Sequence, residues 1–213
     1  MIIALAAVFL LAYLQPPAFL ARVLRASFFF SPPPHRARTL ACYGITFFIL
    51  HVLIIAFFVQ SGYLTCSFES ICYSLPLVLN IACGIGVAFL LAWSEELIFR
   101  GVFFAYNRQY MSTYPSVICT SAIFMLAHNL TAPLTLVTTE WRLGLGLFLL
   151  GILLNMLYIV TNSIAASIGA HMGLVSLKVV LRRIPCIQSA IAYDSLTFHM
   201  DLRQSLIVHG LFI

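Results

Sequence analysis

Long apolar stretches, separated by short polar or proline-containing segments, recur along almost the whole chain. A membrane-spanning helix needs about 20 mostly apolar residues. Stretches of this kind predict membrane spans near Ile2–Leu20, Thr39–Tyr63, Ile85–Tyr106, Val117–Pro133, Leu143–Val160 and Ile164–Leu181. The pattern therefore predicts an all-α fold, namely a polytopic transmembrane helix bundle of about six spans.

The segment Cys72–Tyr106 is longer than one span requires. A helix that rises ~1.5 Å per residue over this length would overshoot a hydrocarbon core of ~30 Å. Either the helix breaks at Gly84 and Gly86, or it protrudes from the membrane. The N-terminal stretch lacks the basic residues and the small-residue cleavage site of a secretory signal, which favours a retained first span.

The composition agrees with a membrane protein. Hydrophobic residues make up 62% of the 213 positions, the mean hydropathy is +1.06, and only 8% of the residues are charged. An average soluble domain has about 25% charged residues, so a water-soluble surface is excluded. The net charge of +5 comes from basic residues scattered at predicted helix ends, which argues against a nucleic-acid partner. We expect a multi-pass integral protein of the cell (inner) membrane, in contact with the lipid bilayer.

Two basic clusters give conflicting indications of topology. The positive-inside rule places the arginine-flanked loop Ser31–Arg38 in the cytoplasm. The same rule places the end of the last predicted span there, because Lys178, Arg182 and Arg183 cluster around it. A simple six-span count does not reconcile the two clusters, so the topology stays open.

Three ionisable residues interrupt the apolar span Ile85–Tyr106, namely Glu95, Glu96 and Arg100. Each charge near the bilayer centre costs ~2.5–3.5 kcal/mol, so three unpaired charges cost on the order of 8–10 kcal/mol. Glu96 and Arg100 are four positions apart with the acid first, the favourable order for a helical ion pair. Glu95 lies about 100° around the helix, where its carboxylate is available as a base.

Two histidines, His128 and His171, also fall within predicted spans. A carboxylate and two imidazoles suit the water-mediated hydrolysis of an amide. Ser94 adjoins the acidic pair, but the chain has no Gly-x-Ser-x-Gly elbow, no His-Glu-x-x-His motif and no Cys-x-x-Cys pair. No cofactor is therefore favoured. If zinc were bound, its ligands would be Glu95, His128 and His171 from separate helices.

The polar positions form three motifs in a characteristic order. They are Glu95-Glu96-x-x-x-Arg100, Phe124-x-x-x-His128, and His171 within a helix of small residues. Together they resemble the CAAX protease and bacteriocin-processing family (CPBP, also called Abi), the type II CAAX prenyl endopeptidase-like intramembrane proteases. The resemblance covers about residues 74–183, roughly half of the chain.

That resemblance implies an all-helical endopeptidase acting on peptide or membrane-protein substrates. It implies that Glu95 activates a water molecule with help from His128. It further implies that Glu96 and Arg100 support the site and that His171 stabilises the oxyanion.

The chain departs from the eukaryotic prenyl-protein proteases at one position. Those proteins carry an asparagine four residues after the last motif histidine, where this chain has Val175. The departure weakens the prenyl-protease assignment in particular, although some bacterial members of the family also lack the asparagine. Asn129 and Asn155 are candidate substitutes, each with the alternative role of an ordinary interhelical hydrogen bonder.

These features predict three regions: N-terminal spans in 1–73, a catalytic domain in 74–183 and a tail in 184–213 that lies on the surface or is loosely ordered. Two alternatives to an endopeptidase remain. One is a catalytically silent immunity or scaffold protein of the same fold. The other is a small transporter that uses the acidic pair as a relay. The sequence does not identify the substrate or its cleavage site.

Overall fold

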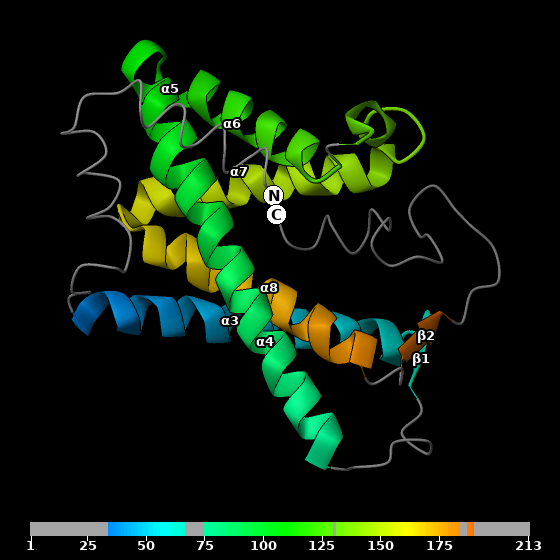
Figure 1. Ribbon diagram of the computed structural model, residues 1–213. Helices are drawn as coiled ribbons and strands as arrows, with labels where there is room; N and C mark the ends of the chain where they lie inside the picture. The colour runs from blue at the N-terminus through cyan, green and yellow to red at the C-terminus, as the bar shows by residue number, and fades with distance from the viewer. Residues whose placement is uncertain (1–33, 67–74, 130, 184–186, 190–213) are drawn as a thin grey trace.

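The fold is all-α, as predicted, in a computed structural model that describes residues 34–66, 75–129, 131–183 and 187–189. The predicted first span Ile2–Leu20 and most of the predicted tail lie outside the described residues. The helices are α3 (Pro34–Gln60), α4 (Leu75–Glu96), α5 (Ala105–Tyr110), α6 (Thr113–Ala127), α7 (Trp141–Thr161) and α8 (Ile164–Arg183). Figure 1 shows α3 beside α8 and α6 beside α7, with the long helix containing α4 running across both pairs.

Four helices of the described part are long and apolar enough to cross a membrane. They cover His35–Gln60, Leu75–Tyr110, Trp141–Thr161 and Ile164–Leu181. Each overlaps a span expected from the apolar pattern, so the prediction of a membrane helix bundle is confirmed.

The second of these helices continues without a break through Gly84 and Gly86. It comprises α4, a π-helical segment η1 (Leu97–Phe104) and α5. Its 36 residues correspond to roughly 54 Å at 1.5 Å per residue, so the helix must tilt or protrude from a ~30 Å core. Of the two alternatives for this segment, the break at the glycines is wrong. The π-helical segment begins directly after the acidic pair, and such segments often occur at functional sites.

The helix observed near the predicted span Val117–Pro133 begins earlier and ends earlier than predicted. Helix α6 begins at Thr113 and ends at Ala127, and its 15 residues are short for a membrane span. The chain then turns and forms a short 3-10 helix, η2 (Pro133–Leu136). The Asn129 side chain stabilises this turn: its Nδ2 donates to Thr135 Oγ1 (2.9 Å), and its Oδ1 accepts from the Ala132 amide (3.3 Å).

Helices α3 and α8 run in the same direction and pack closely. A Cβ on Gly169 would meet the carbonyl oxygen of Leu40, and one on Gly173 would meet that of Gly44. Close approach through small residues is typical of membrane helix pairs. The parallel orientation also bears on topology: Arg36 and Arg38 at the start of α3, and Lys178 and Arg183 at the end of α8, lie at opposite ends of the pair (Figure 1). Both clusters therefore cannot be on the same side of a membrane that the pair crosses.

A two-stranded antiparallel ladder joins the segment after α3 to the segment after α8. Strand β1 (Leu64–Cys66) pairs with β2 (Ile187–Ser189), with Thr65 opposite Gln188. Neither strand was expected, because each has only three residues, too few for an alternating pattern. The division into 1–73, 74–183 and 184–213 stays a prediction.

Candidate active site

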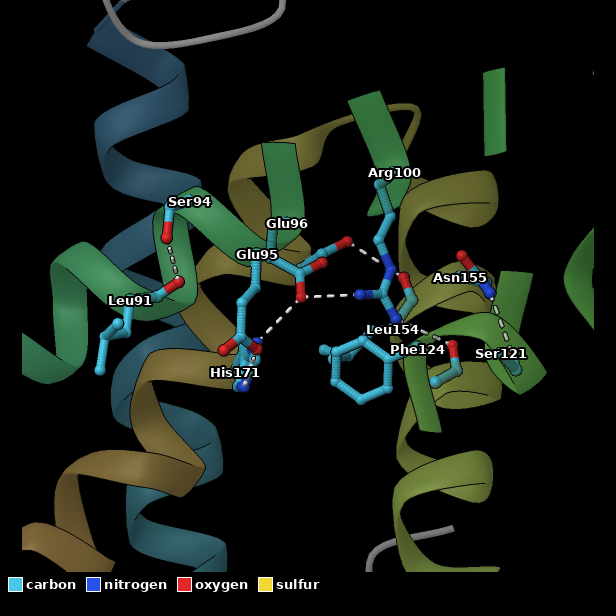
Figure 2. A network of polar contacts seen from close by, with 12 residues as sticks. Leu91, Ser94, Glu95, Glu96, Arg100, Ser121, Phe124, Leu154, Asn155 and His171 are labelled. Carbon is cyan, nitrogen blue, oxygen red and sulfur yellow. Dashed lines mark hydrogen bonds and ion pairs between the residues drawn. The ribbon is translucent and has the colours of Figure 1, made fainter. Parts of the chain in front are cut away.

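The structure brings together the five polar residues that the sequence predicts as a site. Glu95 and Glu96 end α4, Arg100 lies in η1, His128 follows the last residue of α6, and His171 lies in the middle of α8. Four separate elements therefore contribute to one cluster, most of which is shown in Figure 2.

The closed side of the site consists of Glu96, Arg100, Phe124 and the backbone of Gly151. The side chains of Glu96 and Arg100 have 0% exposure. Glu96 Oε1 accepts one hydrogen bond from Arg100 Nη1 and another from His171 Nδ1, each 2.9 Å long (Figure 2). A buried charge requires such pairing, since an isolated ion in a low-dielectric interior is costly. The predicted Glu96–Arg100 ion pair is therefore present, and it also holds His171.

Arg100 reaches a third helix. Its Nη2 donates to the carbonyl oxygen of Gly151 in α7 at 3.0 Å, and its guanidinium carbon lies 4.9 Å from the centre of the Phe124 ring. The absence of a side chain on Gly151 lets α6 and α7 approach, because a Cβ there would lie 3.0 Å from both Cα and Cβ of Ser121. The guanidinium thus ties η1 to α7 while neutralising Glu96.

The open side of the site consists of Glu95 and His128, whose side chains are 31% and 29% exposed. Glu95 Oε2 lies 3.8 Å from Nε2 of His128 and 3.8 Å from Nε2 of His171. These separations are longer than hydrogen bonds. Within the described residues, Glu95 Oε2 has no hydrogen-bond partner. A buried carboxylate oxygen thus faces two imidazole nitrogens across a gap.

The second nitrogen of each imidazole is already bonded. His128 Nδ1 lies 2.8 Å from the carbonyl oxygen of Phe124, which can only accept, so Nδ1 carries the hydrogen. In neutral His128, Nε2 is then an acceptor facing Glu95. His171 Nδ1 donates to the Glu96 carboxylate, so its Nε2 is the atom directed at Glu95. Bonding of the outer nitrogen in this way fixes the orientation of an imidazole ring.

Phe124 is the side chain that links the two sides. It has 0% exposure, and its ring centre lies 4.5 Å from that of His128 and 6.1 Å from that of His171. With the Arg100 guanidinium over the same ring, Phe124 contacts three of the five predicted site residues. The sequence motif included Phe124 but did not predict these contacts, because they depend on how α6 meets η1 and α8.

The candidate substitutes for the missing asparagine are occupied elsewhere. Asn155 is fully buried in α7, and its Nδ2 donates to Ser121 Oγ at 3.0 Å and to the Val117 carbonyl at 3.4 Å (Figure 2). It is the interhelical hydrogen bonder that the alternative prediction described. Asn129 bonds within the turn after α6. Ser94 donates its hydroxyl to the Leu91 carbonyl of its own helix (2.9 Å).

The donors around Glu95 suit zinc in their chemical type but not in their spacing. Zinc bonds of 2.0–2.2 Å in a tetrahedral site place two ligand atoms about 3.3 Å apart. Glu95 Oε2 lies 3.8 Å from the Nε2 atom of each histidine. Each histidine would therefore have to move roughly half an ångström closer to Glu95 to share a zinc ion with it. In the part of the chain that the structure describes, no group of three histidine, cysteine or acidic side chains has the spacing of a metal site.

Apolar helices around a buried cluster of two carboxylates, two imidazoles and a guanidinium define a membrane-embedded protein with a polar intramembrane site. A family model described as "Type II CAAX prenyl endopeptidase Rce1-like" matches residues 76–177, slightly under half of the chain. This segment contains all five site residues, and the match supports the predicted assignment to the CAAX protease and bacteriocin-processing family. The family prediction is therefore confirmed. Comparison with curated proteins and with solved structures found no match.

Proposed function

We propose that this chain is an intramembrane endopeptidase that hydrolyses a peptide bond with a water molecule activated by Glu95. The observation that carries the proposal is the gap between Glu95 Oε2 and His128 Nε2, two acceptors separated by 3.8 Å on the open side of the site. A water molecule has two O–H donors and is stabilised by bonding to both acceptors. Such a water molecule would lie beside a carboxylate able to remove its proton.

The charges of the site support the same assignment. Arg100 balances one of the two carboxylates, and its hydrogen bond identifies Glu96 as that one. One further proton shared between Glu95 and His171 would leave the buried site neutral. A proton on Nε2 of His171 makes this atom a donor, while Nδ1 remains bonded to Glu96. His171 is then suited to stabilise an oxyanion.

The proposed reaction proceeds in two steps. Glu95 takes a proton from the water while the water oxygen bonds to the carbonyl carbon of the peptide. His128 orients the water, and the resulting oxyanion accepts a hydrogen bond from Nε2 of His171. The carbon–nitrogen bond then breaks, and the leaving nitrogen takes the proton from Glu95. The products are a carboxylic acid, which keeps the second proton of the water until it ionises in solution, and an amine, and the site returns to its initial protonation state.

The two alternative functions explain less of the structure. A transporter would be expected to have helices broken at paired positions in two similar halves. In the described residues the helix Leu75–Tyr110 instead continues through the acidic pair. A silent scaffold would need neither the Glu95 carboxylate without a hydrogen bond at Oε2 nor the facing imidazole of His128.

The test compares the terminal peptides of membrane proteins from cells that express the wild type, Glu95→Gln or Ser94→Ala. Ser94→Ala is the matched control, because it changes the neighbouring residue on the same helix. We expect a set of new termini in the wild type and the control that is absent with Glu95→Gln. These termini would also show whether the substrate is a lipidated C-terminus, a bacteriocin leader or an ordinary membrane-protein tail. Identical termini in all three samples would favour the silent protein or the transporter.

Catalysis without a metal is part of the proposal. Arg100 already balances the negative charge of Glu96 next to Glu95. No metal is therefore needed to keep Glu95 available as a base. We expect purified protein to keep its activity after exhaustive dialysis against a strong chelator, with no stoichiometric zinc by elemental analysis. Loss of activity that added zinc restores, with about one zinc per chain bound through Glu95, His128 and His171, would establish a metalloprotease instead.

A further inference from the structure

Asn155 is a fully buried polar residue on α7 that the proposed reaction does not use. Its Nδ2 lies 3.0 Å from Ser121 Oγ and 3.4 Å from the Val117 carbonyl oxygen, both on α6. A carbonyl oxygen can only accept, so the atom that faces Val117 is the donating nitrogen of the amide. Asn155 therefore supplies directional hydrogen bonds that join α7 to α6.

The amide oxygen of Asn155 has no hydrogen-bond partner among the described residues. Leaving a buried polar atom without a partner costs free energy, which offsets part of what the hydrogen bonds of Nδ2 contribute. An apolar side chain of similar size would avoid this cost. We therefore expect Asn155 to contribute little net stability and to act mainly on the relative placement of the two helices.

The same part of the α6–α7 contact holds Arg100. Gly151 precedes Asn155 by four residues, about one helical turn, so the two residues lie on the same face of α7. The Gly151 carbonyl oxygen accepts from Arg100 Nη2 at 3.0 Å. On α6, Phe124 follows Ser121 by three residues, and its ring centre lies 4.9 Å from the guanidinium carbon. Each helix thus contributes one contact to Arg100 within about one turn of the hydrogen bond between Asn155 and Ser121 (Figure 2).

The close approach of α6 and α7 does not by itself fix how the two helices are placed. A Cβ on Gly151 would lie 3.1 Å from Ser121 Oγ, so the contact surface consists of small groups. Small residues let helix backbones come close, but they offer few directional contacts that would prevent sliding or rotation. The hydrogen bond from Asn155 to Ser121 has a preferred distance and angle, so it restricts these movements.

We propose that Asn155 is a positioning residue that holds α6 and α7 in the arrangement in which Arg100 bonds Glu96. The arrangement matters because Arg100 Nη1 and His171 Nδ1 share Glu96 Oε1 as their acceptor, each at 2.9 Å. A shift of Arg100 would therefore move Glu96 and, through it, His171. The inference rests on the role of His171 in the proposed function. Asn155 acts on the guanidinium and has no contact with the substrate.

The first arm of the test measures peptidase activity in Asn155→Leu, Ser121→Ala and Thr120→Val. The first two variants each remove one partner of the same hydrogen bond, so either one serves if the other fails to fold. Thr120→Val is the matched control. Thr120 adjoins Ser121 on α6, is fully buried, and accepts a different hydrogen bond, from Asn107 Nδ2 at 3.2 Å.

We expect kcat of Asn155→Leu and Ser121→Ala to fall roughly 3- to 20-fold, the range that corresponds to interhelical hydrogen bonds in membranes, with KM unchanged. The melting temperature of Asn155→Leu should stay near that of the wild type, because leucine removes the unpartnered amide oxygen together with the donor. Thr120→Val should lose much less kcat. An equal loss in this control would overturn the positioning role, because any lost hydrogen bond of α6 would then have the same effect.

The second arm does not depend on activity. Nitrogen-15 NMR of the arginine side chains reports the Nε–H group of Arg100, which is assigned by the loss of its signal in Arg100→Lys. We expect this signal to shift or broaden in Asn155→Leu and Ser121→Ala and to stay near its wild-type position in Thr120→Val. The same result without any peptidase activity in the wild type would overturn the proposed function and leave the positioning role intact. An Arg100 signal that is unchanged in both test variants, whatever happens to kcat, would overturn the positioning role.

Discussion

The closed side of the site, around Glu96, and its open side, around Glu95, differ in exposure and in how their polar atoms are bonded. The Glu96 and Arg100 side chains are fully buried and joined at 2.9 Å, and Oε1 of Glu96 also accepts from His171. Glu95, one position earlier, is 31% exposed, and its Oε2 faces two imidazoles at 3.8 Å. Adjacent carboxylates of identical chemistry are thus placed in opposite environments.

This difference shows how one helix can supply both support and reactivity. Glu96 Oε1 already accepts hydrogen bonds from Arg100 and His171, so this carboxylate holds neighbouring side chains in place. Within the described residues, Glu95 Oε2 has no hydrogen-bond partner, and Glu95 is the more exposed of the two, so it can take a proton from water without breaking a buried contact. We therefore assign stability to the closed side and chemistry to the open side, and three substitutions test this division.

The largest expected effect is on activity, from Glu95→Gln. Glutamine keeps the shape of glutamate but cannot accept a proton at neutral pH, so we expect cleavage to fall by about 10²–10⁴-fold, the usual contribution of a general base. The melting temperature should stay near that of the wild type, because Glu95 takes no part in the buried ion pair. Full activity would remove Glu95 as the base, and a large loss of stability would contradict the division into two sides.

The next largest effect is expected from Arg100→Lys on the closed side. An ammonium lacks the planar fork that bonds Glu96 and the Gly151 carbonyl together while stacking on Phe124. We expect a loss of about 2–3 kcal/mol in the free energy of unfolding, the scale of a hydrogen bond to a charged group, together with reduced activity. Thermal unfolding in detergent measures the first quantity and a peptide cleavage assay the second. A stable and fully active Arg100→Lys protein would mean that only the positive charge matters.

A smaller effect is expected from Gly151→Ala, which perturbs the closed side from α7. The added Cβ would lie 3.0 Å from Cα and Cβ of Ser121, so α6 and α7 would have to separate. We expect a destabilisation of about 1–2 kcal/mol, typical of mild overpacking. Gly86→Ala is the matched control, because a Cβ there meets nothing within 4 Å, and its melting temperature should not fall. Equal melting temperatures for the two variants would show that the α6–α7 contact tolerates extra volume.

Much of the fold followed from local pattern. Apolar stretches of about 20 residues correspond to α3, α7 and α8, because backbone groups in a membrane must be bonded within each helix. The end of α6 at Ala127 was not predicted, because the span was expected to continue to Pro133, whereas the chain turns around Asn129. The sequence also did not determine whether α4 continues through Gly84 and Gly86, because glycine occurs both within membrane helices and at helix breaks.

By itself, the sequence determined that the protein is a membrane helix bundle and that Glu96 and Arg100 form a helical ion pair. It also determined that five polar residues lie within apolar spans, where burying them costs free energy. These conclusions depend on composition and on spacing along one helix, which are local properties. Only the tertiary structure decided that His171 bonds Glu96 while Glu95 Oε2 lies 3.8 Å from both imidazoles without a hydrogen bond. It also decided that Phe124 contacts Arg100 and both histidines. Those relations depend on the rotation and separation of helices far apart in the chain, and a spacing along the sequence does not specify either quantity.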